Sequence, residues 1–301
     1  MGTRSLTIRL LVGKEMANYW LRKQALWSVA GTAVLMASVS TVVKATEPCD
    51  DFGECKALIE INASDGDIGF HWLGDADDLR SMRIDDPNGA KVYTNRASGP
   101  LREQKLTETF GESAEPLCWD DPEADEDEEI VTLREFLERW DEGTYIFSGQ
   151  GEQGEKLSGE TELTYMIPAA PADVDFDGTQ ITWAAGDDLG NCASYNDLTT
   201  LVSEGVLPIH PENVVVDAYE VVLEPDVEDG DPVGNLVYSI RVPGDIVTTA
   251  VTVPSEYLAS LPADTPVKVE VGAIGGEDNA TFTEEDGFCV NEDEGCEDEE
   301  E

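Results

Sequence analysis

The chain has 301 residues and a formal net charge of −47 at pH 7, because 65 acidic residues outnumber 18 basic ones. This length accommodates one large domain or two of about 100–150 residues each. So strong a negative charge excludes nucleic acid and anionic membrane surfaces as partners, since both would be repelled by most of the protein surface. The acidity instead suits salty or cation-rich surroundings, where dissolved ions screen the repulsion between carboxylates.

The N-terminal segment has the features of a secretory signal peptide. Basic residues at 22–23 precede an apolar, uncharged run at 25–43, and Val43-Lys44-Ala45 forms a small-residue cleavage site. We therefore expect residues 1–45 to be removed and the protein to be exported to the periplasm or the exterior. Met16 is the expected true start, because the residues before it add nothing to the signal. The alternative is a retained anchor helix, since the apolar run is long enough to span a bilayer.

The cysteine content supports export to an oxidising compartment. All six cysteines follow the predicted cleavage site: Cys49, Cys55, Cys118, Cys192, Cys289 and Cys296. An even number of cysteines in an exported chain favours disulfides. Proximity in sequence favours the pairs Cys49–Cys55 and Cys289–Cys296, which leaves Cys118 with Cys192, although other pairings are open. A zinc site is the competing interpretation, but the sequence contains no C-x-x-C pair.

After the first cysteines, apolar and polar residues alternate with the period of two that is typical of β-strands. The predicted strands are 57–62, 68–73, 81–84, 91–93, 143–149 and 161–165. Asp86-Pro87-Asn88-Gly89 is a strong turn signal between two of them. Short strands at this spacing predict an N-terminal β-sandwich domain over residues 46–166, with a solvated acidic loop at 120–129.

One helix is expected to interrupt these strands. Thr132 and Glu135 form a capping box, in which each side chain accepts a hydrogen bond from the other residue's backbone amide. Leu133, Phe136, Leu137 and Trp140 then follow at the spacing of one apolar helix face. Gly143 is the expected end of this helix.

The second half carries strand-like segments in a recognisable order. They are a Trp-bearing strand at 180–184, a Tyr-bearing strand at 217–223, strands at 236–240 and 248–253, a Leu-Pro turn at 261–262, and strands at 267–271 and 280–283. This ordered set resembles a fibronectin type III module, and the N-terminal domain resembles sandwich domains that precede such modules in exported bacterial proteins. The resemblance implies an immunoglobulin-like domain at 167–290 that serves as a spacer or binding surface, with no catalytic residue carried over.

Two features depart from the fibronectin type III pattern. Val267 stands where the family has the tyrosine of a tyrosine corner. An insertion at 187–211 separates the second and third strands, and Leu198 and Leu201 predict a short helix within it that ends at Gly205. Beyond the module, residues 291–301 form an acidic tail.

The candidate metal ligands are aspartates. Asp173, Asp175 and Asp177 precede Gly178 in the D-x-D-x-D-G pattern that begins a calcium loop. The twelfth position of such a loop should be a bidentate glutamate, yet it is Ala184, so an acidic turn between strands is the alternative. A second acidic set is expected in loops of the N-terminal domain, where it favours calcium or simply solubility: Asp65, Asp67, Asp75, Asp77 and Asp78.

The residue types of common hydrolases are scarce. The chain has only two histidines, His71 and His210, and neither lies in an H-E-x-x-H motif. No G-x-S-x-G elbow occurs. We therefore assign no catalytic residue and expect both histidines to be packed or at the surface. A pocket with carboxylates converging around His71 or Trp72 would instead favour an enzyme.

Together these features predict a mainly β protein with two β-sandwich domains and one or two short helices. The expected function is that of a non-enzymatic exported unit for binding, adhesion or structure, whose partner is a protein or glycan of the cell envelope. No cofactor is expected apart from the calcium candidate. The alternatives are an accessory protein of carbohydrate or peptide processing and a calcium-dependent adhesin.

Overall fold

β-Strands dominate the computed structural model, which describes residues 49–121, 129–228, 230–292 and 296. The predicted mainly β class is therefore confirmed. The predicted signal peptide, residues 122–128 of the acidic loop and nearly all of the acidic tail lie outside the described residues. Among the described helices, none combines the length and apolar character needed to cross a bilayer.

The elements of the first half follow the predicted strands closely. They are β1 (Glu54–Asn62), β2 (Asp67–Leu79), β3 (Ser81–Asp85), β4 (Lys91–Arg96), α2 (Gly99–Gln104), β5 (Leu106–Glu112), α3 (Leu133–Arg139), β6 (Gly143–Gln150) and β7 (Lys156–Leu163). β5 and α2 were not predicted, because their residues are mostly exposed and carry no clear alternation. The capping box at Thr132 is present, but α3 ends at Arg139, before the expected Gly143.

The elements of the second half likewise match the expected order, with two additions, β8 and α5. They are β8 (Ala172–Phe176), β9 (Gln180–Ala184), α4 (Tyr195–Ser203), β10 (Val216–Pro225), β11 (Tyr238–Pro243), β12 (Ala250–Thr252), α5 (Ser255–Leu258), β13 (Thr265–Gly275) and β14 (Ala280–Val290). β8 occupies the start of the predicted calcium loop, because Val174 and Phe176 are buried between exposed aspartates.

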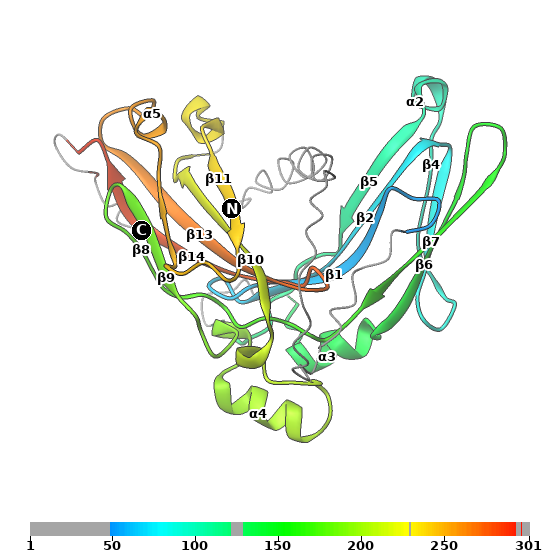
Figure 1. The fold of residues 1–301 in the computed structure, drawn as a ribbon, viewed down its shortest axis with the longest axis horizontal. Coiled ribbons are helices and arrows are strands. Elements are labelled where there is room, and N and C mark those ends of the chain that lie inside the picture. The colour runs from blue at the N-terminus through cyan, green and yellow to red at the C-terminus, as the bar shows by residue number, and fades with distance from the viewer. Residues whose placement is uncertain (1–48, 122–128, 229, 293–295, 297–301) are drawn as a thin grey trace, which may run out of the picture. The chain divides into compact units, whose positions relative to one another are not determined.

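Three sheets organise these strands (Figure 1). The largest has seven strands in the order β11-β10-β13-β14-β1-β2-β5. A four-stranded sheet, β4-β3-β6-β7, packs against its β1-β2 end, and a three-stranded sheet, β12-β9-β8, packs against its β10-β13 end. Each pair of sheets encloses its own apolar core, as expected for two β-sandwiches.

The first core is built from alternating strand residues. Ile59 and Ile61 of β1 are fully buried, and they belong to one cluster with Phe70 of β2 and Phe147 of β6. Helix α3 adds Phe136 and Leu137 to the same cluster. Period-two alternation therefore places one face of each strand in the core and the other outside it.

The second core contains the aromatic pair that the fibronectin type III resemblance pointed to. Trp183 of β9 and Tyr219 of β10 have ring centroids 5.3 Å apart, and both side chains are buried. Val267, at the position where the resemblance would place a corner tyrosine, is fully buried in this core with Val269 and Val271. An apolar residue at this position thus contributes to packing rather than to a hydrogen bond at the strand corner.

The two halves of the chain share the seven-stranded sheet. β1 and β14 pair in parallel, with Glu60 opposite Ala280 and Asn62 opposite Phe282. Residues 46–301 accordingly form one unit by their contacts, whereas the apolar cores remain two. Independent folding of the predicted domains 46–166 and 167–290 stays a prediction.

The insertion at 187–211 packs on the first core, although it lies within the second predicted domain. Leu198 and Leu201 of α4 are buried in the cluster that contains β1 and β2. The Cys118–Cys192 disulfide links the insertion to the segment after β5. The other two disulfides, Cys49–Cys55 and Cys289–Cys296, close short loops, so the three pairs are those favoured by sequence proximity.

Candidate functional site

The seven-stranded sheet has one apolar face and one charged face. The apolar side chains of β13 are fully buried in the second core, while Lys268 and Glu270 alternate with them on the opposite face. The neighbouring strands follow the same alternation. The resulting charged face extends across both halves of the chain and comprises Glu60, His71, Glu220, Glu224, Lys268, Glu270 and Glu284.

Lys268 compensates part of this negative charge. Its ammonium nitrogen lies 2.8 Å from a carboxylate oxygen of Glu284 and 3.4 Å from one of Glu224. Burial by itself lowers the pKa of Lys268, but the hydrogen bonds and charges of these carboxylates raise it above its ordinary value. Burial raises the pKa of Glu224, and Lys268 offsets only part of that rise. At the edge of the sheet, Arg241 forms a second ion pair with Glu220.

Glu270 is the least compensated carboxylate on this face. It lies directly opposite Glu284 in the β13–β14 register, and like charges at such positions repel each other. Burial, together with the charges of Glu284, Glu60 and Glu224, raises the pKa of Glu270 to about 8, against a partial opposing effect of Lys268. This raised pKa favours the protonated form of Glu270 at neutral pH.

This raised pKa predicts a pH dependence of stability. Because Glu270 binds its proton more tightly in the folded protein than in the unfolded chain, its contribution to stability grows as pH falls from about 8 toward its ordinary pKa, and is lost as pH rises through 8. The expected slope is at most about 1.4 kcal/mol per pH unit. Urea unfolding of the Glu270→Gln variant between pH 5 and 9 should remove this slope, while exposed Glu256→Gln should retain it. An unchanged slope in Glu270→Gln would contradict the assignment.

His71 lies between two carboxylates on the same face. Only 3% of the His71 side chain is exposed. Its Nε2 atom is 3.1 Å from Oε1 of Glu115, and its Nδ1 atom is 3.7 Å from Oε2 of Glu60. The three residues come from different parts of the chain, since His71 is on β2, Glu60 on β1 and Glu115 in the segment after β5. Two carboxylates thus converge on His71, which is one part of the arrangement that would favour an enzyme.

The other histidine has a structural role. His210 is buried and stacks near Tyr195, with ring centroids 4.4 Å apart. Its Nε2 atom lies 3.2 Å from the Tyr195 carbonyl oxygen, and its Nδ1 atom accepts the backbone N–H of Glu212. His210 therefore caps the short helical turn that begins at Pro211.

The predicted calcium ligands do not gather around one point. Asp173 and Asp175 are exposed on β8, and Asp177 lies in the following turn, where its Oδ1 atom accepts hydrogen bonds from Thr179 and Gln180. Within the described residues, the group of three metal-ligating side chains found within 4.8 Å of one another is Glu60, His71 and Glu115. Calcium binding at Asp173, Asp175 and Asp177 stays a prediction.

The second set of aspartates is arranged differently from the expectation. Four of them were expected in loops but lie within β2, which continues to Leu79: Asp67, Asp75, Asp77 and Asp78. Burial and the nearby charges of Glu54 and Asp77 raise the pKa of Asp75. Asp65 alone occupies the turn before β2, where it accepts a hydrogen bond from Asn62.

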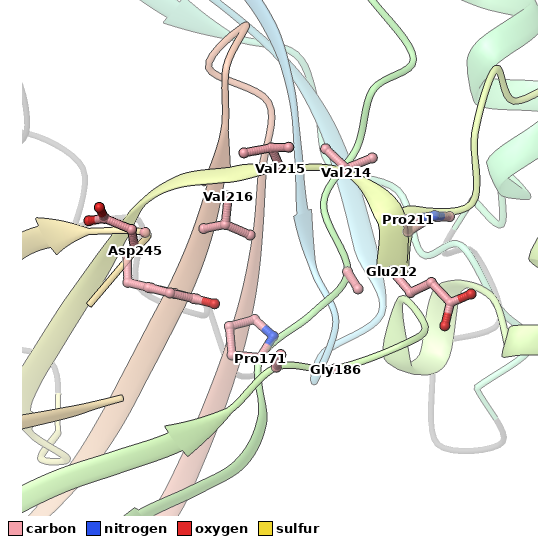
Figure 2. Close-up of a pocket in the computed structure, with 12 residues that line it drawn as sticks. Pro171, Gly186, Pro211, Glu212, Val214, Val215, Val216 and Asp245 are labelled. Atoms are coloured by element: carbon pink, nitrogen blue, oxygen red, sulfur yellow. The ribbon is translucent and has the colours of Figure 1, made fainter. Parts of the chain in front are cut away.

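His71 lines neither of two cavities found among the described residues. The first has a volume of about 340 Å³ and lies where the insertion returns to β10, with Val215, Pro171 and Gly186 around it (Figure 2). The second, about 420 Å³, is polar and lies beside the junction of the two halves, near Ser64, Asn191 and Glu284. The lining of the second cavity includes Ser64 and acidic residues, and the Ser64 hydroxyl is bonded to the backbone of Glu284.

Comparison with protein-family models gives no match, and comparison with curated proteins gives none. Three solved structures align at low similarity. A tetra-tandem repeat from the extending region of a large adhesion protein is 12% identical, with 79% of this chain and 49% of that chain covered and a TM-score of 0.24. The BSP domain of a biofilm-associated protein is 12% identical, with 81% and 30% covered and a TM-score of 0.22.

The third structure belongs to a 1.5-MDa bacterial ice-binding adhesin. It is 14% identical, with 79% of this chain and 64% of that chain covered and a TM-score of 0.21. The chain thus spans between 30% and 64% of these three structures. With TM-scores this low, the alignments assign neither a fold family nor a function.

Proposed function

We propose that this protein is an exported, non-enzymatic unit for binding or structure at the cell envelope or outside the cell. The observation that carries the proposal is the architecture of the chain. Two sandwich cores share one sheet, and three disulfides cross-link the chain. Disulfides persist in oxidising compartments and are rare in the cytosol of mesophiles. A sheet that continues through both cores also fixes their relative orientation, which suits a unit that presents one surface to a partner.

The second half of the unit is a fibronectin type III module in this proposal. Its strands form a three-stranded sheet, β12-β9-β8, facing the four strands β11-β10-β13-β14. This division into facing sheets of three and four strands supports the assignment. The buried Trp183–Tyr219 pair supports it as well. The insertion and the shared β1–β14 pairing are then additions specific to this chain.

The proposed function has a direct test. The secreted protein should begin at Thr46, as read by N-terminal sequencing, and should retain a protein or glycan from envelope fractions in pull-down and glycan-array experiments. Hydrolysis of an envelope polymer, with no partner retained, would overturn the non-enzymatic role. A protein that keeps its first 45 residues would overturn cleavage and favour the anchored form.

A processing enzyme or its accessory protein is the second candidate function. The observation that favours it is the convergence of Glu60 and Glu115 on the buried His71. Hydrolytic activity that disappears in the His71→Gln variant, and persists in His210→Gln, would support this candidate over the first.

A further inference from the structure

We propose that Glu60, His71 and Glu115 bind one divalent transition-metal ion of the zinc class. One donor atom from each side chain lies within 4.8 Å of the other two. In a tetrahedral zinc site with bonds of about 2.1 Å, the donor atoms are about 3.4 Å apart. The 3.1 Å separation of His71 and Glu115 is already close to that spacing. The Glu60 donor lies farther away, within 4.8 Å of the other two, and would have to move closer to complete the site.

The donor types select the class of ion. Calcium and magnesium prefer sites built from oxygen ligands, whereas imidazole nitrogen combined with carboxylate oxygen suits zinc, manganese, iron, cobalt or nickel. Three protein ligands leave at least one coordination position for water or for a partner's group.

The surrounding sheet holds this donor set in place. β2 lies between β1 and β5, with His71 opposite Leu58 on one side and Glu112 on the other. The ring also meets Phe110 edge-on, with ring centroids 6.0 Å apart. A ligand held by strands on both sides loses little conformational freedom when it binds an ion, which favours affinity.

Gly69 keeps the space around the donors open. A Cβ atom at this position would lie 2.8 Å from Nε2 of His71 and 2.9 Å from a carboxylate oxygen of Glu115. Any side chain at residue 69 would therefore displace the two groups that contribute the closest donor pair. This glycine provides a second observation, separate from the donors, that this part of the sheet accommodates the cluster.

The field of the whole protein favours a dication at this position. The net charge of −47 raises the local concentration of cations. The same field attracts cations weakly to every carboxylate of the surface. A test must therefore distinguish binding at one defined site from general binding to surface carboxylates. A proton shared between His71 and the two carboxylates is the competing occupant, and the test must separate that as well.

The chain provides an internal control for this test, because it contains only two histidines. We suggest titrating the tag-free, disulfide-bonded protein with Zn²⁺ at pH 7 in 1 mM Ca²⁺, while the ring signals of both histidines are followed by NMR. The His210→Gln variant assigns the two signals. The His71 signals should change and saturate at one equivalent of Zn²⁺, and those of His210 should not change.

Calorimetry of three variants completes the test. His71→Gln and Glu115→Gln should each lower the Zn²⁺ affinity at least tenfold, whereas His210→Gln should leave it unchanged. Near-UV circular dichroism verifies that each variant is folded. If a variant does not fold, the NMR titration of the unmodified protein still tests the proposal. Unchanged His71 signals would overturn the proposal in favour of a proton-bridged cluster. Equal changes at both histidines would overturn it in favour of general binding to the acidic surface.

Discussion

Replacing Cys118 and Cys192 together with alanine should lower the free energy of unfolding by about 4 kcal/mol, the expected effect of opening a loop of this length. The disulfide joins residues 74 apart in sequence, by far the largest separation of the three. It also holds the insertion against the first core, where α4 buries Leu198 and Leu201. Urea unfolding at fixed salt, followed by tryptophan fluorescence, measures the change.

The Cys49–Cys55 disulfide is the matched control. It involves the same chemistry and buried sulfur atoms, but the separation is only 6 residues. The same loop-entropy relation gives a loss of about 2 kcal/mol for Cys49→Ala with Cys55→Ala. Equal losses for the two pairs would show that loop length does not determine the stabilisation, and would contradict the role assigned to Cys118–Cys192.

Replacing Asn279 with alanine should lower the free energy of unfolding by about 2–4 kcal/mol, because one buried and two partly buried backbone groups would lose their partner. The Asn279 side chain is fully buried just before β14. Its Oδ1 atom accepts the backbone N–H of Ile59 at 2.8 Å. Its Nδ2 atom donates to the carbonyl oxygens of Thr164 at 2.7 Å and Met166 at 3.2 Å. One side chain therefore joins β1, the segment after β7 and the second half of the chain.

Asn213→Ala is the control for this substitution. Asn213 is exposed, and its Nδ2 atom donates to the neighbouring Glu212 side chain, a bond that water can replace. Its loss should change stability by less than about 0.5 kcal/mol. Urea unfolding at pH 7 compares the two variants. If Asn279→Ala were as stable as Asn213→Ala, the hydrogen bonds of Asn279 would not be needed to hold the two halves together.

Local patterns in the sequence located most of the secondary structure. Alternation marked β1, β3, β6 and β9, the turn at 86–89 lies between β3 and β4, and Thr132 begins α3 through its capping box. The residues of each such signal lie close together in the sequence, so each signal can be recognised without the rest of the chain. These signals failed at β5, where no residue is buried, and at β8, where two exposed aspartates alternate with two buried residues.

The candidate metal site could not be predicted in the same way. His71 and Glu60 are brought together by the register of β1 and β2, and Glu115 reaches them from a segment beyond β5. No spacing motif connects these residues along the chain. A signal was nevertheless present, since a lone histidine between two aromatic residues in a strand had to lie on the face opposite them.

The sequence by itself determined the acidic character of the protein, its mainly β class, the order of its strands and its favoured disulfide pairs, because composition, alternation and cysteine spacing are local properties. The tertiary structure decided that β1 pairs with β14, that the insertion packs on the first core, and that the charged face continues across both halves. Each of these depends on contacts between residues far apart in sequence. Their free energy comes from burial and hydrogen bonding in the folded chain, and no short segment encodes it.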